Sequence, residues 1–259
     1  DDYEEKDRQM LSSRGVDLSG LTQSQGKTFH WEGAYEGDLN EATTKKTELN
    51  VFEHFNPQLP EKYRSSKFVF LANIAPELQL QVLSQVENPY FVAMDTMNFW
   101  ILSRKEALKN VLKKVDAILI NEQESMMLTG ASNAIGAAKK ITEMGPSAVV
   151  IKRGEYGFML YSVDTGFFAL PAFPIEKVVD PTGAGDTFAG GFMGYLSGLN
   201  RKPKSQDFRR ACAKGTILSS FTIQDFGVHH LKGVNKNQMY DRLQQYQSVI
   251  TLGPQEVLL

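Results

Sequence analysis

The 259-residue sequence contains a single cysteine, Cys212, and lacks any long run of apolar residues. One cysteine cannot form an internal disulfide, and the chain does not open on a charged segment followed by an apolar one, so nothing in it predicts secretion. Charged residues interrupt every hydrophobic stretch before it reaches the roughly 18 residues needed to cross a bilayer. We therefore expect a cytoplasmic protein that has no membrane partner.

The sequence also lacks an excess of charge of either sign. Lys and Arg number 28, Asp and Glu number 30, and the formal net charge is -2. Such a chain has no overall field that would attract nucleic acid, so we expect a small-molecule partner. Its length fits one large α/β domain, or one domain with a small appendage, and is sufficient to bury an apolar core.

Two alternating segments predict a small β structure near the N-terminus. In residues 27–35 apolar and polar side chains alternate, and residues 45–53 repeat the pattern after a polar turn at 37–40. This period of two is typical of half-exposed strands. The predicted division of the chain is a β lid over residues 27–53 and an α/β core over residues 1–26 and 54–259.

From residue 68 onwards, apolar strand patterns alternate with helical ones. The strand patterns are almost continuously apolar, as expected of parallel strands that helices cover on both faces. We therefore predict a three-layer α/β fold with a mostly parallel sheet. The predicted strands are 68–74, 91–95, 117–121, 148–152, 157–161 and 167–170, and the predicted helices are 76–86, 103–115, 133–144, 184–198 and 206–222.

The clearest chemical pattern lies in residues 178–192. An apolar strand pattern leads into a turn that contains Gly183 and Gly185, and a helix pattern begins near Ala184. The first N–H groups of a helix lack intrahelical acceptors and lie at its positive end, so this turn can hold a phosphoryl group. Asp186 lies in the same first turn and can face an acceptor hydroxyl. Alternatively, Asp186 only complements the helix dipole and the glycines only permit the turn.

A second pattern places an amide and a carboxylate at the end of another strand. Asn121 directly follows the apolar residues 117–120, and Glu124 stands three residues later, where a helix is expected to open. Oxygen ligands at this spacing can face one site and hold hydrated Mg²⁺ beside phosphates. Asn121 could equally be an ordinary helix N-cap.

Residues 180–191 resemble the C-terminal signature of the ribokinase-like (PfkB) carbohydrate kinases, D-[TP]-T-G-A-G-D-x-F-x-x-G. The resemblance implies ATP-dependent transfer of a phosphoryl group to a hydroxyl, with Asp186 as the catalytic base. It also implies a monovalent cation, K⁺, near Asp180 and Thr182. The residues whose N–H groups would form the anion hole are Gly183, Ala184 and Gly185.

Three more segments resemble nucleotide-binding parts of the same family. Asn121 and Glu124 match its N-x-x-E motif, which implies that they order magnesium and phosphates, Glu124 through water. Gly154 and Gly157 fit the family's G-x-x-G pair beside the nucleotide, although Lys152 stands where Thr is common, and hairpin chemistry also explains glycines there. The last pair, Ala211 and Gly215, resembles the small-residue helix beside the adenine, and tight helix packing accounts for it just as well.

The acceptor-binding residues are the least determined. Asp95 and Asn98 follow a strand at the edge of the sheet where open α/β folds bind ligands, so we expect them to contact the acceptor or a phosphate. Trp31 and Tyr35 could stack on an acceptor or simply pack within the lid. The acceptor could be a hexose, a pentose, a keto-sugar acid or a nucleoside, and the lid could pair with a second copy of the chain.

The resemblance departs from the family at the front of the chain. The family begins with a βαβ segment that carries an acceptor-binding Asp and a Gly-Gly turn, whereas this sequence opens on Asp1 and a helix pattern at 4–11 that Gly15 ends. We expect the natural protein to extend before Asp1 by at least one βαβ unit of about 30 residues. Without that segment we expect a gap in the sheet and poor binding of the acceptor.

A catalytically silent relative that only binds a nucleotide is the rival function. Such a relative could lose the carboxylate at position 186 without harm to the fold. The presence of Asp186 therefore favours an enzyme.

Overall fold

The computed structural model describes residues 2–35 and 42–251, and these fall into two compact units. The first takes in the chain up to residue 66 together with 77–88; the second takes in 67–76 and the chain from residue 89 onwards. The predicted turn at 37–40 lies outside the described residues. The unit that contains the β hairpin is larger than the lid of residues 27–53, whose limits stay a prediction.

The first unit consists of short helices around a two-stranded sheet. Helix α1 ends where Gly15, at φ 77°, adopts the left-handed conformation, so that the N–H groups of Gly15 and Val16 bond back to the carbonyls of Ser12 and Leu11. This pair of bonds is the Schellman motif that glycine favours, and it confirms the predicted helix end. The elements of the unit are α1 (Glu5–Ser13), β1 (His30–Tyr35), β2 (Ala42–Glu48), η1 (Asn50–His54), α2 (Glu61–Arg64) and α3 (Pro76–Ser84).

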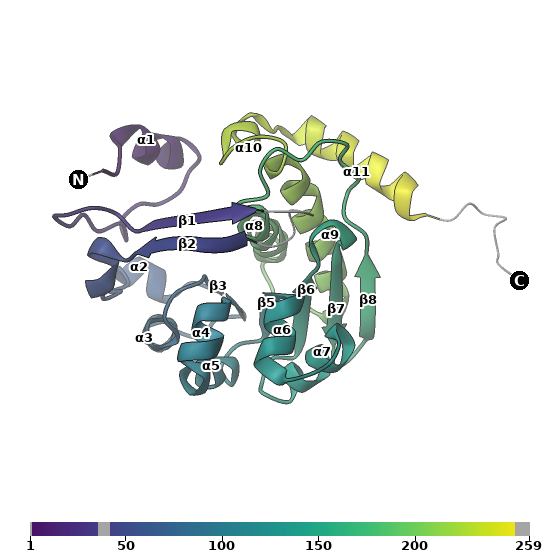
Figure 1. Ribbon diagram of the computed structural model, residues 1–259, viewed down its shortest axis with the longest axis horizontal. Coiled ribbons are helices and arrows are strands. Elements are labelled where there is room, and N and C mark those ends of the chain that lie inside the picture. The colour runs from purple at the N-terminus through teal and green to yellow at the C-terminus, as the bar shows by residue number, and fades with distance from the viewer. Residues whose placement is uncertain (1, 36–41, 252–259) are drawn as a thin grey trace, which may run out of the picture. The chain divides into compact units, whose positions relative to one another are not determined.

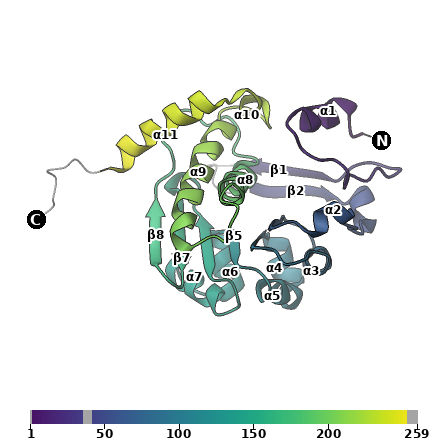
Figure 2. The same ribbon diagram turned by 180° about the vertical axis from the view of Figure 1, so that it is seen from behind.

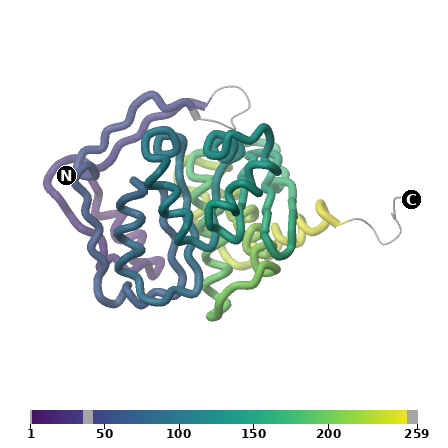
Figure 3. The backbone as a smooth tube through the Cα atoms, turned by 90° about the horizontal axis from the view of Figure 1, so that it is seen from below, coloured from purple at the N-terminus to yellow at the C-terminus, as the bar shows by residue number. Residues whose placement is uncertain are grey.

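Strands β1 and β2 pair antiparallel, and Figure 3 shows them side by side. The predicted second strand at 45–53 is wrong beyond Glu48, because Asn50 takes φ 51° and the chain turns into the 3-10 helix η1. There Phe52 packs edge-on against Phe29, with 5.6 Å between ring centres. The chain after Glu48 thus leaves the strand, and its Phe52 packs against Phe29 next to β1.

The second unit is built on a six-stranded sheet in the order β3-β4-β5-β6-β7-β8. The first four strands are parallel, and the last two join antiparallel. Figures 1 and 2 show helices α6 and α7 on one face of the sheet and α8 and α9 on the other. The three-layer, mostly parallel prediction is therefore confirmed. The strands are β3 (Phe68–Leu71), β4 (Phe91–Asp95), β5 (Ala117–Asn121), β6 (Ala148–Lys152), β7 (Phe158–Ser162) and β8 (Gly166–Leu170).

The helices of the second unit follow the predicted pattern in part. The predicted helix 103–115 corresponds to α5, and Arg104, at φ -135°, separates α5 from α4, which was not predicted. Helix α10 was not predicted either. Helix α11 was not predicted, and its Tyr246 is fully buried and donates a hydrogen bond to the carbonyl of Pro171. The helices are α4 (Asn98–Ser103), α5 (Lys105–Leu112), α6 (Glu122–Thr129), α7 (Ala134–Thr142), α8 (Ala184–Ser197), α9 (Ser205–Thr222), α10 (His229–Gly233) and α11 (Lys236–Ile250), and the 3-10 helix is η2 (Gly154–Tyr156).

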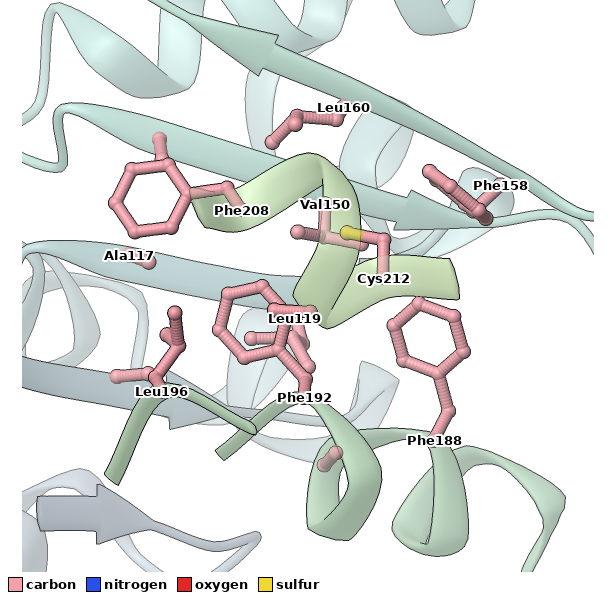
Figure 4. Packing of buried hydrophobic residues seen from close by; sticks show 14 of the residues in the cluster. Ala117, Leu119, Val150, Phe158, Leu160, Phe188, Phe192, Leu196, Phe208 and Cys212 are labelled. Atoms are coloured by element: carbon pink, nitrogen blue, oxygen red, sulfur yellow. The ribbon is translucent and has the colours of Figure 1, made fainter. Parts of the chain in front are cut away.

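The core between the sheet and helices α8 and α9 fixes the start of α8. Phe188 and Phe192 of α8 and Phe208 of α9 lie over the strands, as Figure 4 shows. Alternate residues of β4, β5, β6 and β7 meet them because successive side chains of a strand point to opposite faces. These strand residues are Phe91, Ala93, Ala117, Leu119, Ala148, Val150, Phe158 and Leu160. No helix in the described ranges is both long and apolar enough to span a membrane.

Candidate active site

The first turn of α8 leaves backbone donors unused. Gly183 is the N-cap at φ 79°, a conformation that favours glycine, and the Ala184 N–H donates to the carbonyl of Pro181 at 3.1 Å. Within the described part of the chain the N–H groups of Gly185 and Asp186 have no acceptor. Two such donors at the positive end of a 14-residue helix can bind an anion. Of the predicted anion-hole donors Gly183, Ala184 and Gly185, Ala184 is thus engaged by Pro181, and Asp186 supplies a donor that was not predicted.

The approach to this turn differs from the prediction. The described residues 172–180 form no strand, so the predicted apolar strand before Asp180 is wrong. The segment is instead held by the Val179 N–H, which donates to the carbonyl of Ile223 at the end of α9. The side chain of Asp180 accepts from the Thr182 N–H at 2.9 Å and so shapes the turn.

Three parallel strands bring polar residues to the same edge of the sheet. Asp95 ends β4, Asn121 ends β5 and Lys152 ends β6, and Asn121 and Lys152 are direct register partners. Lys152 Nζ lies 3.1 Å from Asp95 Oδ2, and both side chains are largely buried. A Cβ placed on Gly185 would lie 3.1 Å from the same Nζ, so the ammonium sits against the first turn of α8. The sheet edge and the helix start therefore form one site.

The charges in this site act on one another. Burial works to lower the pKa of Lys152, but the carboxylates of Asp95, Glu124 and Asp186 outweigh it and raise that pKa above its ordinary value. Asp186 remains accessible to solvent, yet partial desolvation and the nearby Asp95 raise its pKa, against the opposing effect of Lys152. The site thus holds a fixed cation and a carboxylate that is more basic than usual.

Glu124 and Asn121 cap helix α6 reciprocally. Asn121 Oδ1 accepts from the Glu124 N–H at 2.7 Å, and Glu124 Oε2 accepts from the Asn121 N–H at 3.0 Å. The N-cap alternative for Asn121 is therefore correct for this structure. Burial raises the pKa of Glu124 to about 7, although hydrogen bonding from Asn121 and the charge of Lys152 oppose the shift.

The family of the chain follows from its sequence. The profile described as "pfkB family carbohydrate kinase" matches residues 1–232. The chain belongs to this family. It is 35% identical over 204 residues to a cytidine kinase of Thermococcus kodakarensis, an alignment that covers 76% of this chain and 71% of that protein. It is 23% identical over 175 residues to a nucleoside kinase of Methanocaldococcus jannaschii, over 68% of this chain and 54% of that protein.

Solved structures of two other kinases share the fold. An aminoimidazole riboside kinase from Salmonella enterica, solved with aminoimidazole riboside and an ATP analogue, matches with a TM-score of 0.75 at 21% identity, over 94% of this chain and 82% of that one. A fructokinase from Vibrio cholerae, solved with fructose, ADP and calcium, matches with a TM-score of 0.74 at 16% identity, over 91% and 80%. The ribokinase-like architecture is thereby established for this chain.

The other predicted nucleotide contacts lie in the β6–β7 connection and at the contact of α8 with α9. Gly154 and Gly157 both have positive φ in the connection between the antiparallel strands β6 and β7, and a Cβ on Gly157 would come 2.2 Å from the Leu170 carbonyl oxygen. Ala211 and Gly215 are buried in α9, where Gly215 faces the Phe188 carbonyl of α8. The hairpin and packing alternatives account for all four positions, and contact with the nucleotide stays a prediction.

The predicted acceptor contacts divide between the two units. Asp95 is buried in the site, and Asn98 is exposed at the start of α4, where its side chain accepts from the Phe99 N–H. Trp31 belongs to the hairpin of the first unit, where its ring covers Gly33 and its Nε1–H donates to Thr44 Oγ1 at 3.1 Å. The packing alternative therefore holds for Trp31, and its contact with an acceptor stays a prediction.

The donor set fits a magnesium ion shared with phosphates. Among residues 2–35 and 42–251, no three His, Cys, Asp or Glu side chains cluster as a complete metal site. Glu124 offers a partly buried carboxylate beside the anion site, and Mg²⁺ is usually bound by one or two carboxylates together with water and substrate phosphates. Glu124 is the residue of this chain that would hold it, and the K⁺ site at Asp180 and Thr182 stays a prediction.

Sequence reasoning missed Lys152 as a member of the site, because the residue stands out there only as a departure from the Thr common in the family. The signal was available, because a lysine at the end of an otherwise apolar buried strand needs a carboxylate partner. Its partner, 57 residues earlier in the chain, could be identified only from the strand order.

Proposed function

We propose that the protein transfers the γ-phosphoryl group of ATP to a hydroxyl of a nucleoside, with Asp186 as the base. The observation that carries the proposal is the position of Asp186 in the first turn of α8, beside two backbone donors without acceptors and beside the charged cluster of Lys152 and Asp95. The helix start supplies an anion site, and the carboxylate stands next to it. Phosphoryl transfer needs this combination of positioning and charge.

In the proposed step the acceptor oxygen attacks the γ-phosphorus in line with the bond to ADP. The new O–P bond forms as the bond between the γ-phosphorus and the β–γ bridging oxygen breaks, and ADP leaves with that electron pair. Asp186 accepts the hydroxyl proton, and its raised pKa makes it a better base than an ordinary aspartate.

The remaining residues of the site bind and orient. The N–H groups of Gly185 and Asp186 donate to the transferred group, where charge develops. Bound magnesium supplies neutralisation of phosphate charge, and Glu124 would hold it from the start of α6. Gly183 lets the chain turn sharply enough to present both donors at one point.

The choice of a nucleoside acceptor rests on the relatives. The cytidine kinase of Thermococcus kodakarensis shares 35% of aligned residues over three quarters of this chain, and a second relative is a nucleoside kinase. A sugar acceptor is the second candidate, because a bifunctional ribokinase/ribose-5-phosphate isomerase of Fructilactobacillus sanfranciscensis is 32% identical over 148 residues.

A panel assay tests the proposal. The purified protein is incubated with MgATP and, in turn, cytidine, uridine, adenosine, inosine, ribose and fructose, and both ADP release and the phosphorylated acceptor are measured. We expect turnover with a nucleoside and little with the free sugars. Turnover with a sugar alone would replace the acceptor but keep the reaction, and ATP binding without any turnover would favour the catalytically silent relative.

A further inference from the structure

Lys152 is a cation buried where the transferred phosphoryl group is proposed to lie. It stands at the end of β6, and its side chain is 19% exposed. The other residues of that strand are apolar and buried, so the ammonium is the one charge the strand carries. Burial of a charged group is costly, and a lysine in this place needs compensation from its neighbours.

The charges around Lys152 exceed what it can neutralise. Asp95 pairs with it at 3.1 Å, and the carboxylates of Glu124 and Asp186 also act on it. A lysine whose only purpose was to neutralise Asp95 could lie anywhere around that carboxylate. This one lies against Gly185, where an added Cβ would meet Nζ at 3.1 Å. The ammonium is therefore directed at the helix start as well as at Asp95.

The two unused backbone donors lie in the same turn that Lys152 touches. Gly185 and Asp186 have N–H groups without acceptors in the described part of the chain. An anion held by these groups would rest beside an ammonium that carries three N–H donors, one of which is given to Asp95. Since charge-assisted hydrogen bonds to phosphate are among the stronger contacts in proteins, the ammonium is well placed to take part.

We propose that Lys152 binds the γ-phosphoryl group of ATP directly and that Asp95 holds its ammonium in place until the nucleotide arrives. The inference rests on the proposed function and adds a phosphate-binding residue to it. Lys152 neither gives nor takes a proton in the transfer. It balances charge on the group that moves from ADP to the acceptor, and it positions that group in front of Asp186.

The difference between ATP and ADP affinity tests this role, because only ATP carries the γ-phosphoryl group. Calorimetric titration of the purified protein with MgATP and MgADP gives both dissociation constants. For Lys152→Met we expect ATP to bind at least about tenfold more weakly, while ADP affinity changes less than about twofold. We expect kcat to fall with it, and Lys152→Arg to recover part of the ATP preference, since the charge is kept.

Two further variants separate this role from a structural one. Lys152→Met removes the cation that pairs with the buried Asp95. The double variant Asp95→Asn/Lys152→Met removes one charge of each sign and so leaves the net charge of the site unchanged, and its thermal stability reports whether the fold is intact. Loss of ATP preference in the folded double variant supports the proposal, and recovery of that preference overturns it. Lys109→Met, which removes a half-buried lysine of α5 that pairs with Glu106, controls for the loss of a positive charge and should leave both affinities unchanged.

The proposal and the function beneath it fail in different ways. A wild-type protein that phosphorylates an acceptor, together with a Lys152→Met variant that keeps the wild-type ATP to ADP ratio, overturns the role of Lys152 alone. A wild-type protein that binds neither nucleotide overturns the proposed function and the role of Lys152 with it.

Discussion

Gly191 of α8 and Gly215 of α9 lie back to back, so close that a Cβ on Gly191 would come 2.8 Å from the Gly215 Cα. Neither helix could approach the other as it does if a side chain stood at this point. The contact fixes the line of α8 on the sheet and hence the place where its first turn presents Asp186.

Gly191→Ala should therefore destabilise the protein by about 1–3 kcal/mol, the range for overpacking of a well-packed interior. Chemical denaturation measures the free energy of unfolding. Gly190→Ala is the matched control: it lies one residue earlier in the same helix with nothing within 4 Å of an added Cβ, and alanine there should stabilise by up to about 1 kcal/mol. Equal effects of the two substitutions would mean that the close contact is not maintained in solution.

Gly183→Ala should weaken the anion site through backbone strain alone. The residue has φ 79° and nothing within 4 Å of an added Cβ, so the expected cost is about 1–2 kcal/mol from the left-handed conformation rather than from a clash. We expect a lower kcat/KM for ATP. Gly183→Asn should recover part of the loss, because asparagine tolerates this conformation better than alanine, and no recovery would point to a cause other than strain.

Glu124 should make the metal-free protein less stable as the pH rises. Its pKa is about 7 in the folded protein against 4.5 as the ordinary value, so the folded state binds the proton more tightly than the unfolded state. The stabilisation is fully present below pH 4.5 and is lost as the pH rises through 7, by up to about 3 kcal/mol. Glu124→Gln should remove most of this slope in denaturation curves at pH 5 and pH 8, and an unchanged slope would contradict the assignment.

The same variant tests the metal-holding role of Glu124. Substitution by glutamine removes the charge and keeps the size, so the magnesium concentration for half-maximal activity should rise several-fold. An unaltered magnesium titration would leave Glu124 with only its capping role.

The hairpin is predicted to move when an acceptor binds and to pair with a second copy of the chain. A two-stranded sheet has little core of its own, and Phe29 remains 43% exposed. In Trp100→Phe, Trp31 is the only tryptophan left, and its emission should change on addition of the acceptor but not of MgATP alone. Light scattering gives the oligomeric state, and a monomer with constant Trp31 emission would count against both expectations.

The sequence predicted the sheet best where burial leaves few choices. Strands β4, β5 and β6 begin and end at the predicted residues, because each is a run of four apolar residues that ends on a polar one between helix patterns, and such a run fits little else. Helix α11 was missed although Met239, Leu243, Tyr246 and Ile250 recur at helical spacing behind an Asn235 cap. The sequence pattern was sufficient to predict this helix. Its apolar side chains pack against Ile217 and Phe221 of α9.

The site was predictable in part. Local motifs predicted that Asp186 and its glycines lie at a helix start, and the structure confirms this position. Such a prediction is possible because helix capping and turn formation depend on only a few consecutive residues. The ion pair of Lys152 with Asp95 depends on the order in which β4, β5 and β6 pair, and no short motif records it.

The central claim is that Asp186 accepts the proton of the attacking hydroxyl. The most direct measurement compares the rate of phosphoryl transfer by the wild-type protein with that by Asp186→Asn, and the MgATP affinity of both proteins is measured alongside. The substitution keeps size and polarity but removes the base, so we predict a loss in kcat of at least about a hundredfold with ATP affinity within a few-fold of wild type. A variant that transfers the phosphoryl group at close to the wild-type rate would contradict the account.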